Sequence, residues 1–141
     1  MKKLLLLLLL SLGFIGNAFA VGAYKCTPEQ AYGVTEEGVL QNDIEKNPNY
    51  YFVDNPKQEF VIDRKTGRFF GGSVGIRGDG ETFTIVSQGD KDTEFKAYFA
   101  EPWSGWLLIL NVKEYSESYK KPFVYLDMPN PTIVTGTCVH Y

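Results

Sequence analysis

Polar and apolar positions alternate in short runs along most of the chain, and turn-forming residues separate these runs. The clearest run is EFVID at 59–63, which places Phe60 and Ile62 on one face and Val61 and Asp63 on the other. A period of two is typical of a half-buried β-strand. The RKTG that follows puts glycine where a hairpin bulge requires a positive φ, so RFFGG at 68–72 is predicted to return as the partner strand.

The same signals predict six further strands, separated by turns rich in Gly, Asp and Pro. They cover 23–35, 82–87, 94–100, 105–115, 121–127 and 132–139. Pro28 predicts a bulge or an edge in the first of them. The run from Trp106 to Leu110 is apolar on both faces and is therefore predicted to be the most buried strand. Residues 41–57 show no strand pattern.

About eight strands with short connections predict an all-β fold built as a single antiparallel meander. Parallel strands would need crossovers of about a dozen residues or more, which the connections do not supply. Such a meander either closes into a small barrel, lipocalin-like or streptavidin-like in size, or stacks as a sandwich. We favour the barrel, and the sandwich is the alternative.

The first twenty residues have the pattern of an export signal. Two lysines precede an apolar stretch at 4–15, and Ala18-Phe19-Ala20 is the small-x-small pattern that predicts cleavage after Ala20. The stretch is shorter than the about 20 apolar residues of a membrane-spanning helix. The sequence therefore predicts a signal peptide over 1–20, a single β domain over 21–141, no membrane anchor, and a periplasmic or secreted location in a bacterium.

The two cysteines lie near opposite ends of the predicted domain. In an oxidising compartment two cysteines usually pair, so a Cys26–Cys138 disulfide is expected. It would join the first strand to the last, which fits closure of a barrel. No CxxC is present, and the single histidine, His140, cannot complete a Cys/His zinc set, so no metal site is expected.

Charge and histidine content exclude several function classes. Removing Lys2 and Lys3 from the 14 basic residues leaves 12 against 17 acidic ones, a net charge of −5. Nucleic-acid binding needs a basic face, whereas an acidic surface suits a cationic partner. A Ser/His/Asp or Cys/His site would have to use His140, so we expect no enzyme and no cofactor. Paired carboxylates for glycoside chemistry stay open, because they pair in space and not in sequence.

The turn EPWSGW at 101–106 holds the candidate binding residues. Trp103, beside Pro102, is expected to be exposed at one end of the barrel, whereas Trp106 begins the most apolar strand and is expected in the core. An exposed tryptophan offers a large flat face to a sugar or a protein. The candidate binding residues are Trp103, Ser104, Gly105 and Trp106.

Short motifs at 24–26, 60–72, 121–125 and 135–138 (YKC, FVIDRKTGRFFGG, KPFVY and TGTC) resemble a group of small exported proteobacterial proteins without assigned function. The likeness implies the fold and adds no chemistry. The Tyr24-Lys25-Cys26 start and the late cysteine also resemble periplasmic C-type lysozyme inhibitors, which are small β-barrels. In that family a Ser-Gly loop enters the lysozyme cleft, and PWSGW holds the dipeptide Ser104-Gly105 here, without the tyrosine, lysine and tryptophan context expected around it in the family.

The sequence thus predicts a non-catalytic module that binds a small ligand or a protein partner. An inhibitor of a cationic cell-wall hydrolase such as lysozyme, and a structural envelope protein, are the alternatives. A small-ligand carrier predicts an aromatic-lined cavity, and an inhibitor predicts a filled barrel with Trp103 exposed. An enzyme predicts buried, closely spaced carboxylates with perturbed pKa values.

Overall fold

The structure is a computed structural model that describes residues 22–42, 58–72, 78–128 and 131–141. Within these residues the chain forms nine β-strands, and every pair of neighbouring strands is antiparallel. The strands are β1 (Ala23–Val34), β2 (Leu40–Asn42), β3 (Phe60–Asp63), β4 (Phe69–Gly71), β5 (Thr84–Gln88), β6 (Phe95–Glu101), β7 (Trp106–Val112), β8 (Lys121–Met128) and β9 (Thr132–His140).

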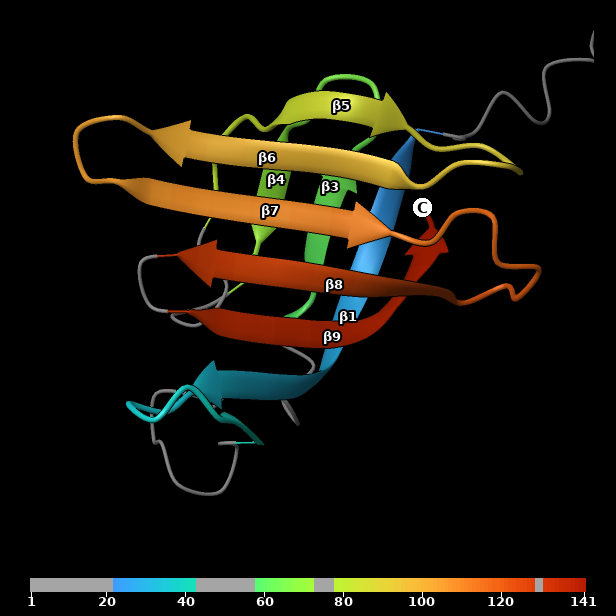
Figure 1. Ribbon diagram of the computed structural model, residues 1–141. Coiled ribbons are helices and arrows are strands. Elements are labelled where there is room, and N and C mark those ends of the chain that lie inside the picture. The colour runs from blue at the N-terminus through green and yellow to red at the C-terminus, as the bar shows by residue number, and fades with distance from the viewer. Residues whose placement is uncertain (1–21, 43–57, 73–77, 129–130) are drawn as a thin grey trace, which may run out of the picture.

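One continuous sheet contains these strands in the order β4-β3-β1-β9-β8-β7-β6-β5, and β2 pairs with β1 beside this path. Figure 1 shows β5 to β9 crossing the front of the molecule while β3, β4 and much of β1 cross behind them. The register of β1 against β9 shifts between Pro28 and Gln30, which confirms the predicted bulge. Because one sheet forms both layers, the fold is a curled half-barrel and not a sandwich of separate sheets.

The two end strands of this path, β4 and β5, meet through the residues beside them. An isolated bridge joins Arg68 to Thr82, and the Phe83 N–H donates to the Gly67 carbonyl at 2.8 Å. Gly67 has a φ of +74°, and a Cβ atom there would lie 2.0 Å from the Phe83 oxygen. Glycine is therefore required at this position for two reasons: the turn needs a positive φ, and the close approach that brings the end strands together leaves no room for a Cβ atom.

The first and last long strands, β1 and β9, pair along most of their length. Cys26 and Cys138 are cross-strand partners in this ladder, and their sulfurs form a disulfide with an Sγ–Sγ distance of 2.01 Å. The predicted disulfide and the predicted pairing of the first and last strands are both confirmed.

Aromatic rings fill the interior of the half-barrel. Phe69 stacks between Phe60 and Phe83, with ring centroids 4.8 and 5.1 Å away, and Phe123 meets Phe60 edge-on at 5.4 Å. These side chains are at most 2% exposed. They come from β3, β4, β8 and the segment before β5, so ring packing ties the front layer to the rear one.

Two expectations about strands need correction. In β7, Leu108 and Leu110 are fully buried, but Leu107 and Ile109 are only half-buried and lie on the outer face of the sheet. A half-barrel has a single interior, so an apolar run cannot be covered on both faces. Residues 40–42, outside the predicted strands, form β2, because a turn at Gly38 (φ +78°) returns the chain so that Leu40 pairs with Val34.

Candidate functional site

The β6–β7 hairpin ends in a turn that we call the Trp103 tip, residues 101–106. Glu101 and Trp106 form the last pair of the ladder, and the Gly105 N–H donates to the Glu101 carbonyl at 3.1 Å. The Ser104 hydroxyl donates to the Glu101 carboxylate and accepts from the Trp106 N–H at 3.3 Å. Ser104 and Gly105 (φ +73°) thus shape the turn that presents the tryptophans.

The structure places the two tryptophans differently. Trp103 is 95% exposed, as the sequence predicted for a residue at the end of the barrel. Trp106 was expected in the core, but it is only half-buried. Trp106 lies on the same face of β7 as the inward-pointing Leu108 and Leu110. It is nevertheless beyond the filled part of the interior, where the space inside the half-barrel opens to solvent.

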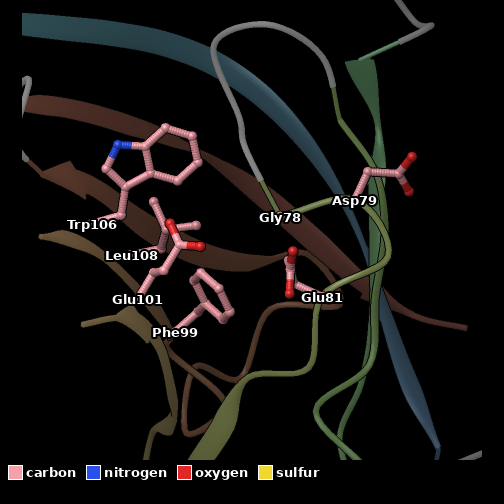
Figure 2. A pocket seen from close by; sticks show the side chains of 7 residues that line it. All are labelled: Gly78, Asp79, Glu81, Phe99, Glu101, Trp106 and Leu108. Atoms are coloured by element: carbon pink, nitrogen blue, oxygen red, sulfur yellow. The ribbon is translucent and has the colours of Figure 1, made fainter. Parts of the chain in front are cut away.

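This opening is a cavity of ≈ 200 Å³ between the β6–β7 hairpin and the segment that precedes β5, and Figure 2 shows it from close by. We call it the acidic cavity. Its apolar lining includes Leu108, which is fully buried, and Phe99, whose ring centroid lies 6.0 Å from that of Phe83. Its residues are Gly78, Asp79, Glu81, Phe99, Glu101, Trp106 and Leu108.

Three acidic residues line this small space, but only Glu81 and Glu101 turn their carboxylates toward it, and no basic residue is among the described lining residues. Figure 2 shows Glu101 beside Phe99 and Trp106 with Glu81 across the cavity, whereas the Asp79 carboxylate points away. Asp79 accepts the Gly71 N–H at 2.8 Å, so it also holds its own loop in place. Acidic groups against low-dielectric walls focus a negative potential, and aromatic faces attract cations as well.

A second polar cluster lies where β1 begins and β9 ends. The Tyr24 hydroxyl donates to the Glu114 carboxylate, and Nε2 of His140 lies 2.8 Å from the other Glu114 oxygen. Burial, followed by the hydrogen bond to Glu114, raises the pKa of Tyr24 above its usual range. Tyr24 and His140 are also direct partners in the β1–β9 ladder. The cluster therefore ties the loop after β7 to the start of β1 and the end of β9.

Carboxyl groups with shifted pKa values have structural partners. The Thr66 N–H holds the pKa of Asp63 below its usual range, and the Asp92 N–H does the same for Asp90. Both carboxylates stabilise turns by accepting backbone N–H groups. These lowered values are the opposite of the raised pKa that a buried general acid needs.

No set of three or more His, Cys, Asp or Glu side chains arranged to hold a metal ion occurs among the residues that the structure describes. In the same part of the chain, there is no helix with the length and apolar character to cross a membrane.

No protein-family model, curated protein or solved structure matches the chain. Sequence reasoning identified Trp103, Ser104, Gly105 and Trp106 but not Asp79 and Glu81, which lie about twenty residues earlier. The sequence gives only a weak sign that Asp79 and Glu81 belong to a site, because GDGE at 78–81 has the pattern of an ordinary turn. This turn lies near the β6–β7 hairpin only because the ends of β4 and β5 meet.

Proposed function

We propose that this chain is an exported, non-catalytic module that binds a cationic protein partner through the Trp103 tip and the acidic cavity. The observation that carries the proposal is the juxtaposition of a 95% exposed tryptophan with a cavity that two carboxylates, Glu81 and Glu101, and two aromatic rings face. Export is supported by the N-terminal pattern and by the Cys26–Cys138 disulfide, which is typical of oxidising compartments.

The size of the cavity favours a protein side chain over a free small molecule. Pockets for small ligands usually measure about 300–1,000 Å³, and this cavity measures ≈ 200 Å³. The interior of the half-barrel is filled by aromatic rings such as Phe60, Phe69 and Phe123. A lysine or arginine side chain fits the remaining space, with its charge near Glu81 and Glu101 and its stem against Phe99 or Trp106.

The Trp103 tip supplies the contact area that the cavity lacks. Tryptophan is enriched among the residues that dominate binding energies, because one side chain buries a large apolar surface. The acidic surface adds long-range attraction, which raises the association rate for a cationic partner and makes that rate sensitive to salt.

Among cationic partners, a cell-wall hydrolase such as lysozyme is favoured by the shape of the tip. The turn joins two inner strands of the sheet and extends past the last β7–β8 pair, Leu107–Met128, and Trp103, Ser104 and Gly105 are all exposed there. A narrow projection of this kind is suited to enter a substrate cleft, and the resemblance to C-type lysozyme inhibitors points to the same partner class. Binding in that mode would inhibit the hydrolase.

The test uses the oxidised protein, residues 21–141, with hen egg-white lysozyme as the cationic probe. Binding is measured by biolayer interferometry over a salt series, and inhibition by clearing of a cell-wall suspension. Trp103→Ala and the double variant E81Q/E101Q are each expected to weaken binding at least about tenfold, the loss typical of a hot-spot residue. Tyr119→Ala is the matched control, because Tyr119 is a 74% exposed aromatic outside the tip.

Binding that is unchanged in Trp103→Ala, or that is lost equally in Tyr119→Ala, would contradict a role for the tip. Absence of binding to any cationic hydrolase, together with a small molecule that copurifies in native mass spectrometry, would replace the partner proposal with a carrier.

A further inference from the structure

The front of the sheet has an outward face that is apolar and uncharged over two rows of residues. Tyr98, Ile109, Leu126, Ile133 and Tyr32 are successive cross-strand partners from β6 to β1 and form the first row. Beside it, Ala100, Leu107 and Met128 form the second row, which the β1–β2 pair extends. We call these ten positions the outer apolar face: Tyr32, Val34, Leu40, Tyr98, Ala100, Leu107, Ile109, Leu126, Met128 and Ile133.

These residues do not belong to the core. Their neighbours along each strand, such as Ala97, Leu108 and Val134, point inward and are at most 1% exposed. On the outer face Tyr98 is 38% exposed and Met128 43% exposed, and none of the ten positions carries a charge. Contiguous apolar surface without charge is typical of interaction sites.

The size of the face points to a weak contact. At a strand spacing of about 4.8 Å and a same-face repeat of about 6.7 Å, ten positions cover about 320 Å² of sheet. The next row, Lys96, Asn111, Val124, Thr135 and Gln30, adds a mostly polar rim and brings the area to about 480 Å² per copy. Two copies would bury about 960 Å², close to the roughly 1,000 Å² at the lower limit of specific interfaces.

We propose that two copies of this chain associate through their outer apolar faces, sheet against sheet, in a weak symmetric dimer. Area selects this occupant, because two such faces together come close to the lower limit of a specific interface, and charge selects the orientation: the chain after the predicted cleavage carries a net charge of −5, so two copies repel wherever their carboxylates face each other. The outer apolar face lets them approach without opposing carboxylates. Twofold symmetry is the commonest arrangement of homo-oligomers, and paired sheets pack face to face at about 10 Å.

This dimer does not depend on the partner proposed above. The acidic cavity opens on the inner side of the sheet, because Trp106 and Leu108 alternate with the outward Leu107 and Ile109. Both cavities therefore stay open, and the dimer presents two Trp103 tips. A bivalent molecule of this kind binds a surface with repeated partners more tightly than either copy alone.

Sedimentation velocity of the oxidised protein over a micromolar-to-millimolar series tests the dimer. The sedimentation coefficient is expected to rise with concentration toward that of a dimer. Ile109→Lys places a charge at the centre of the face, and Met128→Lys does so at a more exposed position where folding is not at risk. Both are expected to weaken association at least tenfold. Tyr119→Lys makes the same kind of change at an exposed position outside the face and is expected to dimerise normally.

Three results would overturn the proposal. One is a wild-type protein that stays monomeric throughout the series. Another is a folded Met128→Lys variant that dimerises like wild type. The third is a monomer that cosediments with neutral phosphatidylcholine vesicles and loses this in Met128→Lys, which would make the face a lipid-binding surface. Binding of the Met128→Lys variant to lysozyme tests the Trp103 tip separately. The dimer and the partner proposal can therefore fail independently of each other.

Discussion

Arg64 donates two hydrogen bonds from its guanidinium group to the main-chain oxygen of Gln88, one from Nε at 3.2 Å and one from Nη2 at 2.8 Å. Nη2 also donates to the Gly89 oxygen at 2.8 Å, and the guanidinium carbon lies 4.9 Å from the centre of the Tyr24 ring. Arg64 follows β3 and Gln88 ends β5, so one buried side chain joins two strands that do not pair. It holds the half-barrel together where the backbone ladder is thinnest.

Replacing Arg64 with alanine is expected to lower the free energy of unfolding by about 2 kcal/mol, because the part-buried hydrogen bonds from a charged donor to the Gln88 and Gly89 carbonyls are lost. Arg64→Lys is expected to restore only part of this loss, since a lysine has no planar fork to serve two carbonyls at once. Urea unfolding followed by tryptophan fluorescence measures both variants. Equal stability of Arg64→Lys and wild type would mean that charge alone, and not the fork, joins the strands.

Removing the disulfide in the double variant C26A/C138A is expected to cost up to about 4–5 kcal/mol, because the closed loop spans nearly the whole domain and the two residues are 112 apart. Thermal unfolding of the variant, compared with the oxidised wild type, measures the loss. The two alanines retain the β1–β9 ladder, so a variant with unchanged stability would show that strand pairing alone holds the ends.

Gly67→Ala and Gly80→Ala form a matched pair that separates two roles of glycine. Both positions have positive φ, +74° and +81°, but only at Gly67 would a Cβ meet another atom closely, the Phe83 oxygen. We expect Gly80→Ala to cost about 1 kcal/mol from backbone strain and Gly67→Ala to cost clearly more. Equal losses in chemical unfolding would mean that the approach of residues 67 and 83 is not needed for stability.

Asp63 is expected to make stability depend on acid pH. The N–H groups of Thr66 and Lys65 donate to its carboxylate at 2.6 and 2.9 Å, and the Thr66 bond is the main cause of its lowered pKa. A lowered folded-state pKa gives stability that is complete above the unfolded value of about 3.9 and is lost as pH falls through the folded value. The stability difference between wild type and Asp63→Asn should therefore shrink below about pH 4. A difference that grows there would contradict this sign.

Most of the strands could be predicted because their signals are local. The alternation in EFVID, the turn at Gly67 and the proline bulge at Pro28 each depend on a few neighbouring residues, and the structure shows all three. Pairing of Cys26 with Cys138 could also be predicted, since two cysteines allow one intramolecular bond. Local sequence patterns and the number of cysteines thus indicated the fold without any knowledge of distant contacts.

What the sequence did not reveal depends on which strands become neighbours. Trp106 looked like a core residue from its apolar surroundings, but its depth is set by where the interior ends. Asp79 and Glu81 join the acidic cavity only because residues 67–69 bond with 81–83. Leu107 and Ile109 were predicted to be buried for a similar reason. Periodicity separates the two faces of a strand, but it does not show which face packs against other residues.

The bond between Cys26 and Cys138 also decides how the protein responds to tension. A pull applied where β1 begins and where β9 ends reaches the sulfur atoms after a few residues and passes directly between them. Residues 27–137 then lie outside the mechanical path, and of the β1–β9 ladder only the pairs beyond the disulfide, Tyr24–His140 and Lys25–Val139, bear load. Stretched between attachments at the start of β1 and the end of β9, the domain would extend by a few residues on each side and keep its remaining strands, its tip and its cavity.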